Sequence, residues 1–216
     1  DHRDLHSFPT RRSSDLGCKA FVLCSVESDL MRKKIDELTE KGYPVVLLNN
    51  DLPGSKRLCF VGPDYLKSGR VAATMVDKCR QNTPLKILVV VGYKEHLGHK
   101  TRVEGFISEL KARRNDFEIV DVIEGKDQDI ITQQVTMKAF LAHPEINVVY
   151  MVTGSGVSGL GAAIIADAVH QRFVVACDEI YTTKELVKND IIDFVICQSP
   201  VVQGYQIGRA SCRERV

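Results

Sequence analysis

The chain has 216 residues, and its 29 Lys and Arg nearly balance its 28 Asp and Glu, so its formal net charge is only +1. This balance, with 44% hydrophobic residues, is typical of a globular protein of one or two modest domains and argues against a nucleic-acid-binding or membrane-binding surface. The chain also lacks an apolar run long enough to cross a bilayer.

Both ends of the chain differ in character from the rest. Residues 1–16 and 207–216 are predicted to be non-native tails, because HSFPTRRSSDL and IGRASCRERV resemble translated sequencing-adapter DNA. Neither end carries a hydrophobic period or a cap that ties it to its neighbour. The alternative is a basic arm that binds nucleic acid, which would show a sustained run of positive charge.

Between the tails, short apolar strands alternate with amphipathic helices. Strands are predicted, in chain order, over residues 19–24, 44–48, 59–61, 87–91, 117–123, 148–152, 173–176 and 194–197. Helices are predicted after Ser28, after Asp64 as far as Cys79, around 103–110, and over 130–142, 158–170 and 182–188. Near-continuous Val, Ile and Leu in the strands predicts an α/β fold with parallel sheets covered by helices on both faces.

The cysteines give a prediction about the redox compartment. Six lie between the tails, without a CxxC pair: Cys18, Cys24, Cys59, Cys79, Cys177 and Cys197. Four of them lie in or beside apolar strands, where a free cysteine behaves as a small buried hydrophobe. So many thiols without a disulfide framework favour a reducing compartment.

A glycine-rich segment offers one route to an enzyme. Gly154-Ser155-Gly156-Val157-Ser158-Gly159 matches GxGxxG after a strand, and Asp178 ends the next strand. Together they fit a nucleotide-cofactor enzyme that uses this loop. However, at least four strands precede the motif, whereas a dinucleotide-binding fold normally begins with it. The alternative is a glycine-rich turn that brings a helix close to its strand.

The sequence nominates neither a metal site nor a catalytic site. His96 and His99 form an HxxH pair, but no third ligand follows at a suitable spacing, so two exposed histidines in a loop are predicted. There is no GxSxG elbow and no evident Cys/His pair. We therefore expect no catalytic residue, no metal and no cofactor.

A set of polar residues at strand ends and at a helix start forms the candidate ligand site. In parallel sheets the carboxyl ends of the strands share an edge, so these side chains can converge there. Guanidinium, carboxylate and amide groups suit a polyhydroxylated ligand. The predicted ligand-binding residues are Asn49, Asn50, Arg102, Thr153, Asp178 and Gln198.

Four segments carry a resemblance to a known family: PVVLLNNDLPGSKRLCFVGPDYLKSGRVAA, HKTRVEGF, VVACDEI and VICQSPVVQGYQ. Together they resemble the sugar-binding module of type I periplasmic binding proteins, and most of all the effector domains of lactose-repressor-type transcription regulators. The resemblance implies two lobes that close on a ligand, with the first lobe incomplete. Residues 17–83 would form part of the first lobe, 84–198 the second lobe, and 199–206 the start of the crossover back. A chain with half of one lobe is expected to bind ligand weakly.

The resemblance also implies individual roles for these residues. Arg102 matches the arginine that grips sugar hydroxyls, Asp178 matches the aspartate that accepts from the sugar, and Gln198 matches a hinge-side amide. Asn49 stands where an aspartate is common, and Thr153 where an asparagine is usual. Some relatives place a stacking aromatic at the position that is Asp127 here, which weakens an ordinary hexose assignment.

The function expected from the resemblance is effector sensing in a cytoplasmic transcription regulator of the lactose-repressor type. The partner would be a small sugar-like molecule, with DNA bound only through a missing N-terminal domain and without a membrane. The full-length parent would be a homodimer. Alternatives are a secreted substrate-binding protein of a sugar ABC transporter, periplasmic or lipid-anchored outside the cell, and a sensor-kinase or other receptor module. The alternative from a different functional class is the nucleotide-cofactor enzyme that would use the glycine-rich loop.

Overall fold

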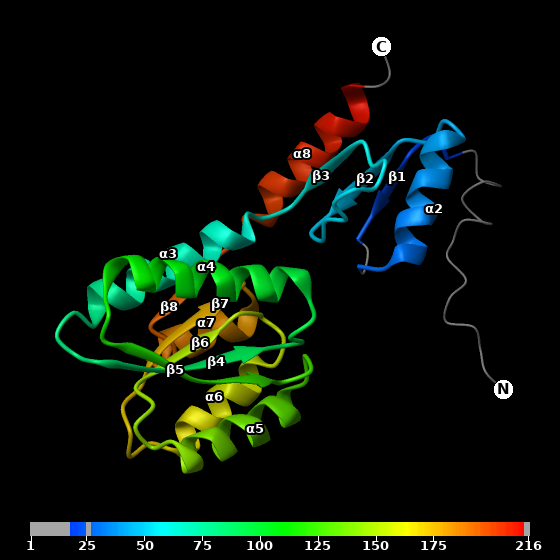
Figure 1. Cartoon of the computed structure of the whole chain (residues 1–216). Coiled ribbons are helices and arrows are strands. Elements are labelled where there is room, and N and C mark those ends of the chain that lie inside the picture. Colours follow the sequence, from blue (N-terminus) through cyan, green and yellow to red (C-terminus); the bar gives the residue numbers. More distant parts are fainter. Residues whose placement is uncertain (1–17, 25–26, 214–216) are drawn as a thin grey trace. The chain divides into compact units, whose positions relative to one another are not determined.

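The computed structural model describes residues 18–24 and 27–213 and shows parallel sheets flanked by helices, as predicted (Figure 1). Its contacts divide the chain into two compact units. The first unit takes in residues up to Gly62 together with those from Ser199 onward, and the second unit runs from Pro63 to Gln198. The predicted tail 1–16 lies outside the described residues. Across the described part of the chain, no helix has the length and apolar character needed to span a membrane.

The first unit contains a small parallel sheet. Its strands are β1 (Phe21–Leu23), β2 (Val45–Leu48) and β3 (Cys59–Val61), in the order β1-β2-β3. Helix α2 (Asp29–Glu40) begins where predicted, because the Ser28 hydroxyl accepts a hydrogen bond from the Met31 N–H at 3.1 Å. Met31 and Ile35 of α2 pack in one apolar cluster with Val45 and Leu47 of β2.

Helix α8 (Pro200–Arg213) returns to this first sheet, where it contacts β2 and β3. The helix continues without a break across residues 206 and 207. The prediction that residues 207–216 are a non-native tail concerns the origin of this sequence, and it stays a prediction. Backbone hydrogen bonds can propagate a helix through any sequence without proline, so an abrupt change in composition need not end it.

The second unit contains a sheet of five parallel strands in the order β5-β4-β6-β7-β8. The strands are β4 (Leu85–Val91), β5 (Phe117–Glu124), β6 (Val148–Met151), β7 (Phe173–Cys177) and β8 (Phe194–Ile196). β4 and β6 lie inside the sheet and are buried along most of their length. This accounts for the continuous apolar runs in their sequences.

Helices cover both faces of the five-stranded sheet (Figure 1). Alternate β4 residues such as Val89 pack with α3 (Tyr65–Cys79) and α4 (Leu97–Arg113). The residues between them, such as Val90, face α5 (Asp129–Ala142) and α6 (Val157–Ala166), with α7 (Tyr181–Lys188) packed on the same layer.

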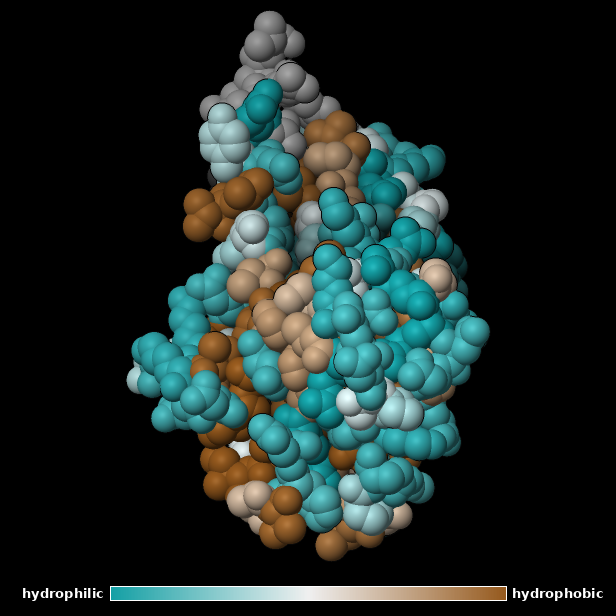
Figure 2. All heavy atoms as spheres, turned by 90° about the vertical axis from the view of Figure 1, so that its left-hand side faces the viewer, coloured by the Kyte–Doolittle hydropathy of each residue, from teal (hydrophilic) through white to brown (hydrophobic). Residues whose placement is uncertain are grey.

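The outer surface of the second unit is mostly polar, with an apolar exception. Figure 2 shows hydrophilic side chains over most of one face and hydrophobic ones at its lower end, at the height of α5 and α6. Leu141 in the last turn of α5 is 84% exposed, and Val169 after α6 is 90% exposed. These helices therefore carry apolar residues on both the inner and outer sides.

Two glycines let α3 and α4 approach each other closely. A Cβ at Gly69 would collide with the backbone oxygen of Arg102, and a Cβ at Gly105 would collide with the backbone oxygen of Leu66. The contact ties α3 to the second unit, so the boundary falls between Gly62 and Pro63 rather than after residue 83 as expected. The turn signals at 82–84 mark a tight connection within the unit and not a lobe boundary.

We expect Gly69→Ala to destabilise the protein although alanine favours a helix. The added methyl has no room beside the Arg102 backbone, and such overpacking costs about 1–3 kcal/mol. Urea unfolding followed by circular dichroism measures the change. Gly204→Ala is the control, since nothing lies within 4 Å of a Cβ at that position in α8, and it should be neutral or slightly stabilising. A Gly69→Ala protein as stable as the wild type would contradict the close packing of α3 on α4.

Candidate functional site

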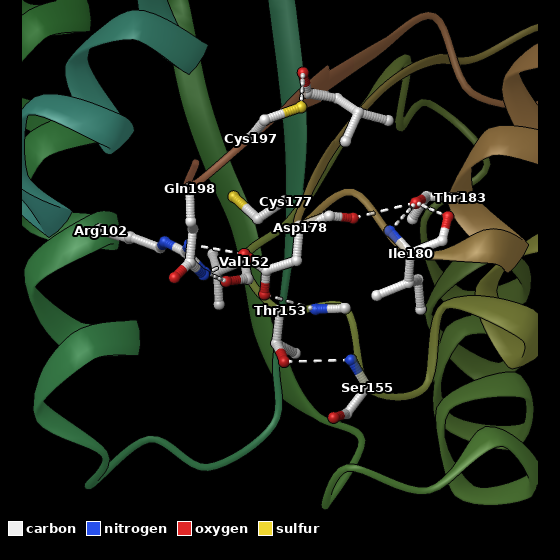
Figure 3. A network of polar contacts seen from close by, with 12 residues as sticks. Arg102, Val152, Thr153, Ser155, Cys177, Asp178, Ile180, Thr183, Cys197 and Gln198 are labelled. Carbon is white, nitrogen blue, oxygen red and sulfur yellow. Dashed lines mark hydrogen bonds and ion pairs between the residues drawn. The ribbon is translucent and has the colours of Figure 1, made fainter. Parts of the chain in front are cut away.

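Polar residues follow the strands at the carboxyl edge of the five-stranded sheet. Thr153 comes after β6, Asp178 after β7 and Gln198 after β8, while Arg102 reaches the same edge from α4 (Figure 3). The Asp178 carboxylate accepts hydrogen bonds from Arg102, from Gln198 and from the N–H of Gly154, the residue after Thr153. The structure thus brings four of the six predicted site residues to one edge of one sheet.

The Arg102 guanidinium is the centre of this arrangement. Its side chain is 2% exposed, and its Nη2 donates to Asp178 Oδ1 at 2.9 Å. Its Nη1 donates to the carbonyl oxygen of Val152, at the end of β6. The ring of Tyr65, at the start of α3, lies with its centroid 5.0 Å from the guanidinium carbon. A buried charge requires partners of this kind, because leaving water is costly.

Asp178 is held from several directions. Gln198 Nε2 also donates to its Oδ1, and the Gly154 N–H donates to its Oδ2 at 3.0 Å. The Thr183 hydroxyl donates to its backbone carbonyl at 2.9 Å. A carboxylate can accept about four hydrogen bonds, so three protein donors fix its orientation and leave capacity for a ligand hydroxyl.

The charges around Arg102 can be assigned at neutral pH. Burial raises the pKa of the Cys177 thiol to about 11, so this neighbour is uncharged. Burial opposes the charge of Arg102, but the Cys177 thiolate, which forms only at high pH, and Asp178 outweigh that effect and raise the pKa of the guanidinium above its ordinary value. With the thiol neutral, Asp178 supplies the negative charge that balances Arg102.

Thr153 lies beneath this network, and its side chain is buried. Its hydroxyl accepts a hydrogen bond from the Ser155 N–H at 3.2 Å (Figure 3). Burial raises the pKa of Asp127, in the connection after β5, and the nearby Thr153 hydroxyl acts in the opposite direction. Thr153 therefore lies between the glycine-rich segment after β6 and the end of β5.

Asn49 and Asn50 belong to the first unit, at the carboxyl end of β2. Asn49 adopts a left-handed backbone with φ of 65°, and its N–H donates to the Val61 carbonyl at 2.9 Å. The Asn50 N–H donates to the Leu48 carbonyl at 2.7 Å. The asparagines thus form the turn that ends β2. A turn was the alternative to a binding role for these two residues, and the binding role stays a prediction.

The glycine-rich segment is used for packing. Gly156 has a φ of +84° and precedes the first residue of α6, while a Cβ at Gly159 would collide with the backbone oxygen of Asp129 in α5. Asp178, which would bind the ribose in a dinucleotide site, is bound to Arg102 instead. These contacts favour the glycine-rich turn over the cofactor loop.

The prediction of two exposed histidines in a loop is wrong for His99. This residue lies in the first turn of α4 and is only 8% exposed, and its ring lies 4.4 Å from that of His96. The i, i+3 spacing places both rings on one side of the helix start, a signal that the sequence offered. Among residues 18–24 and 27–213, no group of three or more His, Cys, Asp or Glu side chains could hold a metal ion.

Sequence reasoning also missed Tyr65 and the position of His99 relative to the strand ends. The Nδ1 of His99 lies 3.3 Å from both the N and the O of Tyr93, so the histidine holds the segment after β4. Burial, with nearby His96 adding to it, lowers the pKa of His99 to about 4. The residue is therefore a neutral structural group at physiological pH.

Comparison with known proteins gives a family match and a set of similar structures. The family model described as periplasmic binding protein domain matches residues 14–213. The structure called XylFII molecule is 24% identical with a TM-score of 0.81, and the alignment covers 91% of this chain and 72% of that one. GanP, a glucose-galactose binding protein from Geobacillus stearothermophilus, is 18% identical with a TM-score of 0.84, covering 93% and 72%. No curated protein sequence matches the chain.

A further similar structure is an ABC transporter solute-binding protein from Burkholderia graminis in complex with D-arabinose. It is 17% identical with a TM-score of 0.84, and the alignment covers 96% of this chain and 75% of that one. These likenesses establish the fold. None of the three structures is described as a transcription regulator, so they give no support to the expected similarity to lactose-repressor-type effector domains.

The lowered pKa of His99 predicts an acid-sensitive fold. Between about pH 6.5 and pH 4 the unfolded chain protonates His99 and the native protein does not, so stability falls as the pH falls through this window. The full effect is on the order of 3 kcal/mol. When the pH is lowered from about 7.5 to about 4.5, we expect the free energy of unfolding to fall less in His99→Asn than in the wild type. Urea unfolding at each pH measures it. Equal losses in the two proteins would show that His99 is not buried as a neutral group.

Proposed function

This chain belongs to the family of periplasmic binding protein domains, and we propose that it binds a small sugar as the ligand-binding domain of a solute-binding protein that serves an ABC transporter. The family consists of binding proteins rather than enzymes. The proposed role follows the descriptions of similar structures, among them the arabinose-bound protein from Burkholderia graminis and the glucose-galactose binding protein.

The observation that carries this proposal is the hydrogen-bonded group of Arg102, Asp178 and Gln198. A sugar presents hydroxyls that both donate and accept, and this group offers a guanidinium, a carboxylate and an amide within contact of one another. The protein fixes Asp178 before any ligand arrives. A ligand hydroxyl therefore meets an oriented acceptor without the entropic cost of ordering it.

The second candidate is a sensing role, as in a cytoplasmic effector domain of a lactose-repressor-type regulator. The cysteines favour it, because Cys18, Cys24, Cys59, Cys79, Cys177 and Cys197 are all free thiols. Exposed thiols such as Cys79 and Cys197 suit a reducing compartment better than an oxidising one. The structure of an XylFII-LytSN complex is also among the similar ones, at 24% identity.

Sugar binding can be tested with Arg102→Lys, which keeps the charge but loses the planar fork. The probes are D-arabinose, D-fucose, D-glucose and D-galactose, titrated against the whole chain by saturation-transfer NMR, which detects weak binding. We expect the wild type to bind at least one of them. The variant should bind that sugar at least about 10-fold more weakly, because lysine cannot hold Asp178 and the ligand together.

The chain offers a matched control for this experiment. Arg172 has a side chain that is 0% exposed, pairs with Asp167 and lies 3.7 Å from the centroid of the Phe140 ring, yet it lies away from the strand ends. Arg172→Lys should disturb the fold to a similar degree and leave sugar affinity unchanged. Equal loss of affinity in both variants, or no binding of any of the four sugars by the wild type, would contradict the proposal.

A further inference from the structure

The ring of Tyr65 lies in a slot on the surface of α4 that a missing side chain leaves open. Gly98 and Arg102 are one turn apart in this helix, so they share a face. A Cβ at Gly98 would lie only 3.0 Å from both Cε2 and Cζ of the Tyr65 ring. The ring can therefore lie against α4 because position 98 has no side chain, and it meets Arg102 one turn further on.

The backbone of α3 places Tyr65 independently of the Arg102 side chain. Tyr65 is the first residue of α3, and the Asp64 carboxylate before it accepts a hydrogen bond from the Lys67 N–H at 2.9 Å. The next residue, Leu66, lies so close to α4 that its backbone oxygen would be 2.1 Å from a Cβ at Gly105. The start of α3 is thus fixed on α4 by its backbone, and the ring can act as a rigid support.

The hydrogen bonds of Arg102 do not by themselves fix the plane of its guanidinium. Nη1 donates to the Val152 carbonyl and Nη2 donates to Asp178, so both bonds are at the outer end of the group. Nε is buried and has no hydrogen-bond partner among the described residues. Two bonds at one end allow the plane to tilt about the line that joins them. The Tyr65 ring, which lies against the face of the guanidinium, opposes that tilt.

The plane of the guanidinium affects the part of the site that a ligand can reach. The Arg102 side chain is only 2% exposed, whereas that of Asp178 is 24% exposed and accepts from Nη2 at 2.9 Å. A tilt of the guanidinium would move this donor and turn the carboxylate with it. The attraction between a cation and an aromatic face is strongest when both are removed from water. The ring therefore influences the ligand through Arg102 and Asp178.

We propose that Tyr65 is a positioning residue of the sugar site, whose ring holds the Arg102 guanidinium in the plane that orients Asp178. Gly98 belongs to the same arrangement, because it keeps the slot open for the ring. The inference rests on the proposed sugar-binding function and adds to it a residue of α3 that acts through Arg102 rather than on the ligand.

Two substitutions at Tyr65 separate the ring from the rest of the side chain. Tyr65→Leu keeps an apolar side chain without a ring. We expect it to bind the best-binding sugar among D-arabinose, D-fucose, D-glucose and D-galactose about 10-fold more weakly than the wild type, as an NMR titration measures. Tyr65→Phe keeps the ring and should stay within about threefold of the wild type. An equal loss in both variants would overturn the inference, because the ring would then not be what the site requires.

Phe140→Leu is the matched control for the loss of a ring. The Phe140 ring lies with its centroid 3.7 Å from the guanidinium carbon of Arg172, which is also buried but lies away from the strand ends. Urea unfolding should show that this variant is less stable than the wild type, while its sugar affinity is unchanged. If it lost as much affinity as Tyr65→Leu, general destabilisation would explain both results and the inference would fail.

The guanidinium can also be observed without a ligand. The NMR signal of a proton near the face of an aromatic ring is displaced by that ring, so the Nε–H signal of Arg102 reports on Tyr65. We expect Tyr65→Leu to shift this signal and Tyr65→Phe to leave it near its wild-type position. Gly98→Ala should shift it as well, because the added methyl pushes the ring away. An unchanged Arg102 signal in Tyr65→Leu would show that the ring does not hold the guanidinium.

The outcomes separate this inference from the proposed function. If the wild type binds a sugar and Tyr65→Leu binds it equally well within twofold, Tyr65 does not position the site and the sugar-binding proposal stands. If none of the four sugars binds to the wild type, the proposed function fails, and the inference fails with it whatever the Arg102 signal shows.

Discussion

The organisation of the second unit depends on a guanidinium that is removed from water. Burying an ion costs several kcal/mol even in a relaxed protein interior, so Arg102 is tolerable only with Asp178, the Val152 carbonyl and the face of Tyr65 around it. Those three groups come from three different places: the ends of β6 and β7 and the start of α3. The close approach of α3 and α4 at Gly69 and Gly105 brings Tyr65 and Arg102 together, so the site depends on this helix packing.

Backbone conformation and chemistry coincide at the strand ends. Asn49, Asp127 and Asp178 all have positive φ and all follow a strand within three residues. Asparagine and aspartate are the non-glycine residues that best accept this conformation, and they are also strong hydrogen-bonding groups. A parallel sheet that ends its strands with such turns thus presents amides and carboxylates at one edge. The turn requirement and a binding role favour the same residues, so neither can be inferred from residue type alone.

Much of this fold could be predicted from the sequence because its signals are local. Ser28 and Asp64 begin α2 and α3 as expected, since each side chain accepts a hydrogen bond from its own helix. The position of α3 could not be predicted, because a nearby turn signal says nothing about which sheet a helix packs on. His99 was misjudged although its i, i+3 spacing from His96 was a local signal of a helix start, and its contacts with Tyr93 and His96 appear only in the structure. The convergence of Arg102 and Asp178 followed from the topology of parallel strands.

The two carboxylates at this edge differ in what the protein supplies to them. Asp178 has its charge balanced and three of its acceptor sites filled by the protein, so its geometry is fixed before any ligand arrives. Asp127 is placed by the backbone turn after β5 and lies outside the ion pairs of the described residues. The proposed sugar binding therefore rests on the buried group around Arg102, where both ions are already oriented.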